Sequence, residues 1–340
     1  MFRERFAPVA YLLLTAALLA VMVLCVCAGN QPIPLRETRA VFFGGEVSEA
    51  NRSILVNVRL PRVLCVALVG ASLSLCGAAM QGLLRNPLAD GSTLGVSSGA
   101  SLGAVIALAF GIAVPGLPHA GTMVTAMLFA FGSLALILSL AWMLDRSLET
   151  NSIILIGVIF SMFASSMMNL VISFAGERIK SITFWTMGSL SGSRYDYALI
   201  LAVSLLVCGG VILLHARELN AFAVGEENAR HIGVNVRRVK LTLMIAVSVL
   251  IGVCVSVGGT IAFVGLVTPH MARLIVGPNH KRLLPASLFS GAIFLLLADL
   301  AARTILRPRE LSIGVVTSLV GAVAFTLILR FRRKGADGDA

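Results

Sequence analysis

Ten stretches of mostly apolar residues follow one another along this chain of 340 residues, and short polar segments separate them. Most stretches are close to the ~20 residues that an α-helix needs to cross the hydrocarbon core of a bilayer. None alternates apolar and polar residues with a period of two, the pattern of a membrane β-barrel strand. The pattern therefore predicts an all-α polytopic membrane protein with about ten transmembrane helices. Their expected ranges are 7–28, 63–84, 92–114, 120–144, 152–175, 197–215, 239–258, 260–276, 283–302 and 312–330.

The composition excludes a soluble globular protein. Hydrophobic residues make up 58% of the chain and charged residues 13%, whereas soluble domains carry about 25% charged residues. We expect residues 1–340 to form a single transmembrane domain. The first apolar stretch is longer than the ~7–15 residues of a signal-peptide core, so we expect it to be retained as a helix.

The net charge of +11 has an explanation in membrane topology. With ten spans and both termini in the cytoplasm, 16 of the 27 Lys and Arg residues fall on the cytoplasmic side, a modest excess in the direction of the positive-inside rule. No basic stretch is interleaved with aromatic residues that could stack on bases, so we expect no nucleic-acid partner. The positive charge on the outer side still needs a reason, and one candidate is an acidic partner that arrives from outside.

The predicted spans hold almost no charge, and none occurs in 63–84, 120–144 or 152–175. Ion-coupled transporters usually place a carboxylate near the membrane midplane, so this class is disfavoured. The chain has no phosphate-binding loop and no hydrolase motif. Its six cysteines are not grouped at metal-ligand spacing. We therefore predict no catalytic residue and no metal site, and the energy for any uphill transport must come from another subunit.

The longest predicted cytoplasmic loop, residues 217–238, reads as two short helices broken at Gly225. Glu226 and Glu227 would lie in the first turn of the second helix, where carboxylates suit the helix dipole. Gly233 would cap its end. Apolar residues among these charges fit two interpretations: a hairpin that docks to a cytoplasmic partner, or an amphipathic loop on the membrane surface.

Five long segments resemble one known family. They are RLPRVLCVALVGASLSLCGAAMQGLLRNPLADGSTLGVSSGA (59–100), GEENARHIGV (225–234), GGTIAFVGLVTPHMAR (258–273), LLPASLFSGAIFLLLADLAAR (283–303) and RELSIGVVTSLVGAVAFTLIL (309–329). Together they are similar to the permease subunits of the FecCD family. Permeases of this family are subunits of type II ABC importers for ferric siderophores, haem or vitamin B12. The likeness covers nearly the whole chain in order and is weakest in 29–57 and 110–150.

This resemblance implies a fold, a location and partners. It implies ten helices in the cytoplasmic (inner) membrane, a homodimer of permeases, two cytoplasmic ATPase subunits and an extracytoplasmic substrate-binding protein. No cofactor is expected in this chain, because ATP and Mg would bind to the ATPase. Residues 217–234 would be coupling helices received by the ATPase, and residues 330–340 a cytoplasmic tail. The coupling residues implied are Ala221, Val224, Gly225, Glu226, Glu227, Ala229, Arg230 and Gly233.

The resemblance also assigns roles outside the hairpin. Arg59, Arg62 and Arg303 match arginines that pair with glutamates on the binding protein in related permeases. The alternative is that they are interfacial arginines whose side chains reach the headgroups. Residues matching Asn86, Leu88, Thr150 and Asn151 narrow the pathway on the cytoplasmic side in relatives. The segment 184–192 resembles the short external helix that closes the pathway outside, and its Trp185 and Met187 fit an interfacial anchor equally well.

Pro269 is expected to break or kink the eighth span, because proline lacks the N–H of a helical hydrogen bond. His270 and Arg273 would then lie at its cytoplasmic end.

The function expected from these observations is permeation of an iron chelate, driven by ATP hydrolysis in a partner and working by alternating access. A ferric siderophore is the first choice, and haem and cobalamin remain open. An ion-coupled secondary transporter and a membrane-embedded enzyme are the alternatives from other classes. Uptake that requires a co-purifying ATPase distinguishes the first hypothesis from both.

Overall fold

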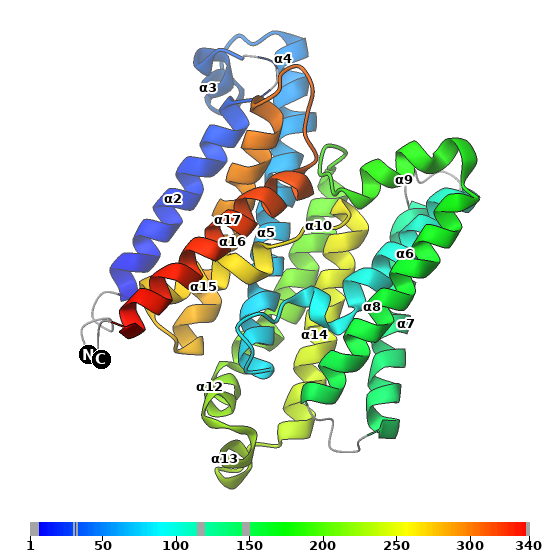
Figure 1. Ribbon diagram of the computed structural model, residues 1–340. Helices are drawn as coiled ribbons and strands as arrows, with labels where there is room; N and C mark the ends of the chain where they lie inside the picture. The colour runs from blue at the N-terminus through cyan, green and yellow to red at the C-terminus, as the bar shows by residue number, and fades with distance from the viewer. Residues whose placement is uncertain (1–6, 30, 32, 114–119, 145–149, 338–340) are drawn as a thin grey trace.

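The computed structural model describes residues 7–29, 31, 33–113, 120–144 and 150–337, and no strand occurs among them. Its long helices run side by side between two ends of the molecule (Figure 1). Each of the ten predicted spans corresponds to a helix. These are α2 (Ala7–Cys27), α5 (Leu60–Leu83), α6 (Val96–Phe110), α7 (Ala120–Leu144), α8 (Thr150–Ser173), α10 (Tyr195–Ser204, continued by a π-helical turn and by α11, Gly210–Leu214), α14 (Val236–Gly258), α15 (Val264–Val276), α16 (His280–Thr304) and α17 (Ile313–Asp337).

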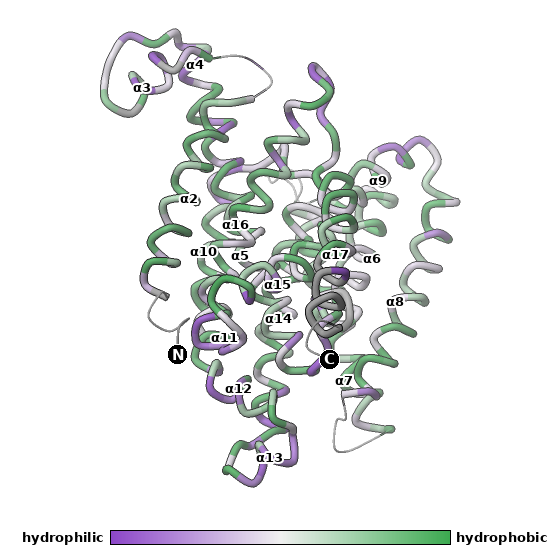
Figure 2. The backbone as a smooth tube through the Cα atoms, turned by 60° about the vertical axis from the view of Figure 1, so that its left-hand side comes forward, coloured by the Kyte–Doolittle hydropathy of each residue, from purple (hydrophilic) through white to green (hydrophobic). Residues whose placement is uncertain are grey.

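Seven of the helical segments in the described chain are long and apolar enough to cross a membrane, and three further apolar helices are shorter. Figure 2 shows hydrophobic backbone through the middle of the molecule and hydrophilic positions gathered at its two ends. One end carries α3 (Leu35–Phe43), α4 (Glu49–Ser53) and α9 (Ile179–Thr186). The other carries α12 (Ala216–Val224) and α13 (Glu226–His231). This distribution fits a multi-span membrane protein, because charged groups avoid the hydrocarbon layer.

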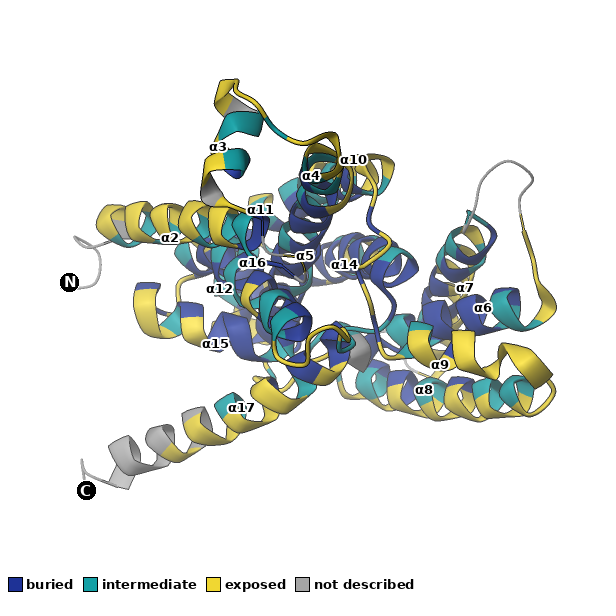
Figure 3. Ribbon diagram, turned by 90° about the horizontal axis from the view of Figure 1, so that it is seen from above, coloured by how far each residue is buried: buried dark blue, intermediate teal, exposed yellow. Residues whose placement is uncertain are grey.

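Helix α5 lies at the centre of the bundle and is its most completely buried helix (Figure 3). It continues α4 through a π-helical turn, so that the helical segment Glu49–Leu83 spans 35 residues. Pro61 cannot donate a hydrogen bond to Asn57, and the turn before it has opened to the wider π spacing. Around α5 pack α14, α15 and α16.

Small residues allow the central helices to approach closely, as is usual between membrane helices. A Cβ on Gly70 of α5 would come 2.4 Å from the carbonyl oxygen of Gly291 of α16. A Cβ on Gly291 would come 2.3 Å from the carbonyl oxygen of Gly70. Glycine is therefore required on both sides of this crossing.

The outer helices form two groups. Helices α6, α7 and α8 pack on one another and reach the centre through α14. Helix α2 packs on α16, and α17 packs on α15 and α16. The outward faces of α2, α8 and α17 are exposed in Figure 3, and their large apolar side chains suit contact with lipid.

Two predicted spans are shorter than expected. The third, expected over 92–114, is helical only from Val96 to Phe110, and the eighth, expected over 260–276, only from Val264 to Val276. At about 1.5 Å per residue, helices of this length cover roughly 20–22 Å, less than the ~30 Å of a bilayer core. Helix α6 is preceded by a loop and a short 3₁₀ helix (Gly91–Leu94), and α15 by irregular backbone; both segments form part of the candidate site.

Pro269 was expected to break or kink the eighth span; it does not break it, because α15 continues through it. Proline leaves the carbonyl of Gly265, four residues earlier, without its helical donor. The side chain of Gln81 on α5 supplies a replacement: its Nε2 donates to the oxygens of Gly265 and Leu266, each at 3.3 Å. The helix therefore retains its hydrogen bonding through contact with its neighbour.

Helix α2 begins, and α17 ends, at the end of the molecule that carries α12 and α13 (Figure 1). The expected tail 330–340 is mostly part of α17, which runs to Asp337, and residues 338–340 lie outside the described chain.

Candidate functional site

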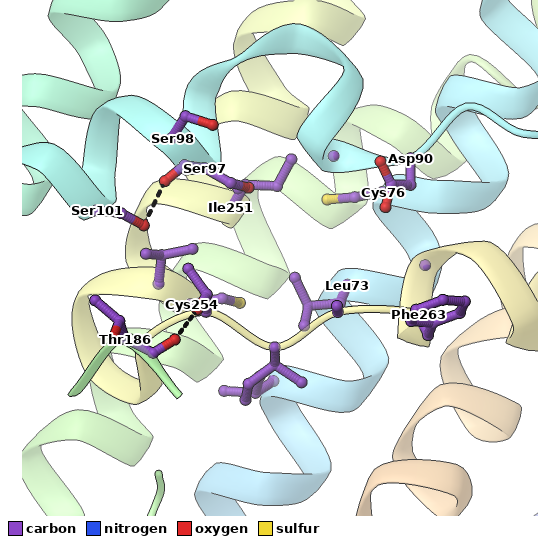
Figure 4. Close-up of a pocket in the computed structure, with 18 of the residues that line it drawn as sticks. Leu73, Cys76, Asp90, Ser97, Ser98, Ser101, Thr186, Ile251, Cys254 and Phe263 are labelled. Atoms are coloured by element: carbon purple, nitrogen blue, oxygen red, sulfur yellow. Dashed lines mark hydrogen bonds between the residues drawn. The ribbon is translucent and has the colours of Figure 1, made fainter. Parts of the chain in front are cut away.

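A cavity of about 290 Å³ lies among α5, α6, α14 and the segment before α15 (Figure 4). Apolar and sulfur-containing side chains form much of its wall, and Asp90 is the one carboxylate among its described lining residues. Hydroxyl groups come from Ser97, Ser98, Ser101, Thr186 and Thr260. Such a wall suits a solute held by contact area and a few hydrogen bonds.

Two interruptions of helical backbone contribute to this wall. The first is the segment 84–95, in which Asp90 and Gly91 reach the cavity before α6 begins. The second is 259–263, between α14 and α15, which lines the cavity along its whole length. Irregular backbone is tolerated at membrane depth where it lines a cavity. The segments that shorten α6 and α15 thus both line the cavity.

The segment 259–263 is packed tightly against the end of α9. Gly259 has a φ of +68°, and a Cβ there would come 2.3 Å from the carbonyl oxygen of Trp185. A Cβ on Gly188 would come 2.4 Å from the carbonyl oxygen of Thr260. The predicted external closing segment, 184–192, thus lies directly beside the cavity, and its helical part ends at Thr186.

Two of the predicted gate residues, Asn86 and Leu88, lie in the loop that follows α5. Asn86 Oδ1 accepts a hydrogen bond from the backbone N–H of Leu88 at 2.9 Å, which closes an Asx turn. The carbonyl oxygen of Pro87 lies 3.0 Å from His270 Nε2, so the loop is held against α15. The Leu88 side chain is 55% exposed.

A second cavity, of about 950 Å³, lies where the gate residues meet the hairpin α12–α13. It is lined by Asn86, Thr150 and Asn151 and by residues 223–228. The structure thus brings three of the four predicted gate residues beside the predicted coupling segment, and Leu88 does not line this cavity. Their role as a gate stays a prediction.

The hairpin has the form that the sequence predicts. Gly225 separates α12 from α13 with φ +129° and ψ +147°. At the end of α13 the N–H of Val234 donates to Ala229 O and the N–H of Gly233 to Arg230 O, both at 3.0 Å. With Gly233 at φ +88°, this is a Schellman motif. The predicted break at Gly225 and stop at Gly233 are both confirmed.

The predicted coupling residues divide between two faces of the hairpin. Ala221, Gly225, Glu226 and Ala229 are buried or half-buried against the chain. The other four are exposed, and they are Val224, Glu227, Arg230 and Gly233. Ile232 extends the apolar part of the exposed face, and it and Val224 are each 72% exposed. An apolar patch among charges is typical of a surface that docks to a protein partner.

One charged contact attaches the hairpin to the bundle. Glu226 Oε1 accepts a hydrogen bond from Thr150 Oγ1 at 2.9 Å and lies 2.7 Å from Lys240 Nζ. Lys240 is almost completely buried in the first turns of α14. The contact thus joins α13 to the first residue of α8 and to α14.

A neutral contact attaches the other half of the hairpin. Asn220 Oδ1 of α12 accepts a hydrogen bond from the backbone N–H of His280 at 2.8 Å. Its Nδ2 donates to Asn279 Oδ1 at 2.9 Å. Helix α12 is therefore fastened to the start of α16.

We expect Gly225→Ala to loosen the hairpin. The φ and ψ of Gly225 lie in a region that is essentially restricted to glycine, and alanine there costs on the order of 1–3 kcal/mol. Hydrogen exchange of residues 226–234 should therefore become faster. Gly210→Ala is the matched control, because Gly210 has a helical φ of −58° and open space at its Cβ position. Equal exchange in the two variants would contradict this account of the hairpin.

The three arginines predicted to dock a binding protein are buried in this structure, so their side chains do not reach the surface as interfacial arginines would. Arg59 Nη1 donates to the carbonyl oxygens of Val26 and Cys27 at 2.9 and 2.8 Å. Arg303 donates to those of Cys25 and Ala28 at 3.3 and 3.4 Å. Both side chains thus satisfy carbonyls at the C-terminus of α2, where positive charge is favourable.

Arg62 belongs to a cluster of four charges, in which Arg62, Asp299 and Arg303 are buried and Glu310 lies at the surface. It donates to Asp299 Oδ1 from Nε and Nη2 at 3.0 and 2.9 Å, and to Glu310 Oε2 from Nη1 at 2.9 Å. Arg303 Nε lies 2.9 Å from Asp299 Oδ2, an ion pair without hydrogen-bond geometry. Two arginines and two carboxylates balance in charge, which explains why arginine can be buried here. Pairing of Arg59, Arg62 and Arg303 with a binding protein stays a prediction that no contact in this structure tests.

The sequence interpretation missed several residues that hold the site together. Asp299 and Lys240 are charges within predicted apolar spans, a pattern that should have indicated buried partners. Gln81 and Asn220 gave no such signal, because an isolated amide is compatible with many positions.

Comparisons with known proteins agree with this architecture. A model of the FecCD transport family matches residues 17–331. An uncharacterised ABC transporter permease of Bacillus subtilis is 41% identical over 96% of this chain and 94% of its own length. The hemin transport system permease of Yersinia pestis is 39% identical over 84% of this chain and 86% of its own. A solved structure described as an inward-facing conformation of a metal-chelate type ABC transporter is 30% identical, with a TM-score of 0.85 over 95% of this chain and 99% of its own.

Proposed function

The chain belongs to the FecCD transport family and is the membrane permease of a type II ABC importer, and we propose that its cargo is an iron chelate, a ferric siderophore first of all. Haem and cobalamin are the alternative cargoes within the same mechanism. In this family the ATPase is a separate subunit, and the permease is not itself an enzyme. An ion-coupled secondary transporter is the alternative from another class, and family membership does not favour it.

The observation that carries the proposal is the position of the first cavity between the predicted inner and outer closing elements. On the hairpin side, the segment 84–95 lines the cavity with Asp90 and Gly91 and also contains the predicted gate residues Asn86 and Leu88. The segment 259–263 connects it with the end of α9 on the other side. A solute in this cavity could be released to either side by moving one of two separate segments, as alternating access requires.

The hairpin is the element through which ATP hydrolysis would act. Its exposed residues Val224, Glu227, Arg230 and Ile232 would dock into the ATPase. Its position beside Thr150 and Asn151 would bring the movement to the cytoplasmic gate. In this proposal two ATPases bind ATP and Mg²⁺, two permease copies form a homodimer, and a binding protein delivers cargo from outside. The hairpin end, with both termini, then faces the cytoplasm.

The wall of the cavity supports an intact chelate as the cargo. Aliphatic and sulfur-containing side chains offer contact area, and the hydroxyls of α6 offer hydrogen bonds. A chelate whose own ligands enclose the metal needs this kind of surface. The hemin permease of Yersinia pestis and the metal-chelate type transporter are similar to this chain, which supports a metal chelate as the class of cargo.

Reconstitution tests the proposal directly. The permease should be purified with its ATPase and placed in liposomes with the binding protein and ATP. Uptake is then measured for a ferric hydroxamate, a ferric catecholate, haem and cobalamin. We expect ATP-dependent uptake of a ferric siderophore and none without the ATPase. Uptake of haem or cobalamin alone would overturn the cargo assignment, and uptake by the permease alone under an ion gradient would overturn the mechanism.

A further inference from the structure

Three elements of the permease meet at one carboxylate oxygen, Glu226 Oε1. Glu226 is the first residue of α13 in the coupling hairpin. Thr150, the first residue of α8, donates to this oxygen at 2.9 Å, and Lys240 of α14 lies 2.7 Å from it. Lys240 Nζ also lies 3.4 Å from Thr150 Oγ1, so the three polar groups form a closed triangle.

The burial of Lys240 makes this contact unusual for the cytoplasmic end of a membrane helix. Lysine side chains normally extend into water, yet the Lys240 side chain is 1% exposed and that of Glu226 is 20% exposed. Breaking a buried ion pair by separating its partners is costly. The hairpin, the start of α8 and the start of α14 are therefore held together more strongly than packing alone would hold them.

The attachment of α12 differs in kind. Asn220 binds Asn279 and His280 through neutral amide groups, and these hydrogen bonds involve no counter-charge. Neutral hydrogen bonds are exchanged for bonds to water at little net cost. The charged contact that attaches α13 is thus stronger than the neutral contact that attaches α12, and it should persist when the hairpin is displaced.

The three joined elements differ in function. The hairpin is the surface offered to the ATPase, Thr150 and Asn151 are predicted gate residues at the start of α8, and α14 lines the central cavity with Ile251 and Cys254. The contacts of Glu226 with Thr150 and Lys240 form a joint among these elements, which would convert displacement of α13 into displacement of both the gate and the cavity wall. Without this joint, α13 could move while α8 stayed in place.

We propose that Lys240 is a positioning residue of the energy-coupling step: it holds Glu226 of the hairpin against Thr150, so that movement of the ATPase reaches the cytoplasmic gate. The inference rests on the proposed function, since it assumes that the hairpin receives the ATPase. It adds a residue outside the hairpin and outside the gate to the coupling machinery. The hydroxyl of Thr150 then acts as the attachment point of α8 to the hairpin.

The test compares Thr150→Val with Thr150→Ser in the complete complex of permease, ATPase and binding protein. Valine keeps the shape of threonine and removes the hydroxyl, whereas serine keeps the hydroxyl. The readout is the distance between spin labels attached at Leu88→Cys in the two permease copies, with and without ATP. Cys27 and Cys208, the two cysteines that are not fully buried, are first replaced by serine.

In the wild type and in Thr150→Ser, ATP should shift the label distance. In Thr150→Val and in Lys240→Met, the shift should be lost while the ATPase stays bound and its hydrolysis rate changes less than about twofold. The same ATP-driven shift in Thr150→Val as in Thr150→Ser would overturn the inference. So would a parallel loss of assembly, hydrolysis and shift in Thr150→Val, because that result indicates a purely structural role.

The two Thr150 variants decide the matter even if Lys240→Met does not fold. Failure of the proposed function would look different. In that case the wild-type complex itself would show no ATP-driven shift and no ATP-dependent uptake. A responsive wild type with an equally responsive Thr150→Val contradicts the role of the joint and leaves the proposed function standing.

Discussion

Replacing Arg62 with methionine is expected to lower the free energy of unfolding by about 3–5 kcal/mol, the usual cost of removing one partner from a buried ion pair. Asp299 is completely buried and receives two hydrogen bonds from Arg62. In the variant, Arg303 is its remaining cation among the described residues, and Glu310 loses its contact as well. Unfolding in mixed micelles with increasing SDS, followed by tryptophan fluorescence, measures the change.

Arg194→Met is the matched control for this prediction. Arg194 pairs with Asp196 at 3.1 Å at the same end of the molecule, but the two side chains are 56% and 50% exposed. Exposed pairs of this kind contribute less than about 1 kcal/mol. Adding Asp299→Asn to Arg62→Met should recover part of the loss, since it removes the uncompensated carboxylate. Equal losses in Arg62→Met and Arg194→Met would contradict the buried cluster.

The buried cluster changes how docking of a binding protein should be tested. The resemblance to related permeases suggests a docking test in which Arg59 and Arg62 are replaced by glutamate. In this structure, these replacements would also break contacts that hold α2 and α16 in place. A loss of docking in that variant would then report damage to the fold. Arg307 and Arg309 are exposed just after α16, and changes there test electrostatic docking without removing a buried partner.

The sequence predicted the spans and the hairpin well because their signals are local. Apolar length defined the helices, and glycines at residues 225 and 233 marked the two ends of α13. The broken third and eighth spans were predicted less well. An apolar segment such as 260–263 has the composition of a membrane helix, and its irregular path depends on contacts with α9 that are distant in the sequence.

The burial of Arg62 could not be predicted from local pattern. Arginine at the end of an apolar stretch is typical of an interfacial residue, and the partner of Arg62, Asp299, lies 237 residues away in the sequence. The same holds for Lys240 and Glu226, which belong to different predicted elements. Arg303 is different, because Asp299 lies four residues before it on the same helix. Which distant charges pair is decided by how the helices pack, and the packing cannot be predicted from the pattern of a single sequence.

Glycine gives the clearest case of a requirement set by packing, and Gly77→Ala is expected to be strongly destabilising. A Cβ on Gly77 of α5 would come 1.9 Å from the carbonyl oxygen of Gly265 and 2.5 Å from its carbonyl carbon. Both are backbone atoms, so α15 must move as a whole to relieve the clash. We expect a loss of at least about 3 kcal/mol, at the upper end of the range for overpacking, measured by the same SDS titration.

Movement of α15 should also reach the cavity, because Gly265 is one of its lining residues and Gln81, one turn after Gly77, binds the carbonyls of α15. Gly132→Ala is the control: Gly132 lies in α7, where a Cβ meets nothing within 4 Å. Alanine there should be neutral or stabilising by up to about 1 kcal/mol, since it favours the helix. If Gly77→Ala were as stable as Gly132→Ala, α5 and α15 could not cross as closely as the structure shows, and the α5–α15 side of the cavity would have to be rebuilt.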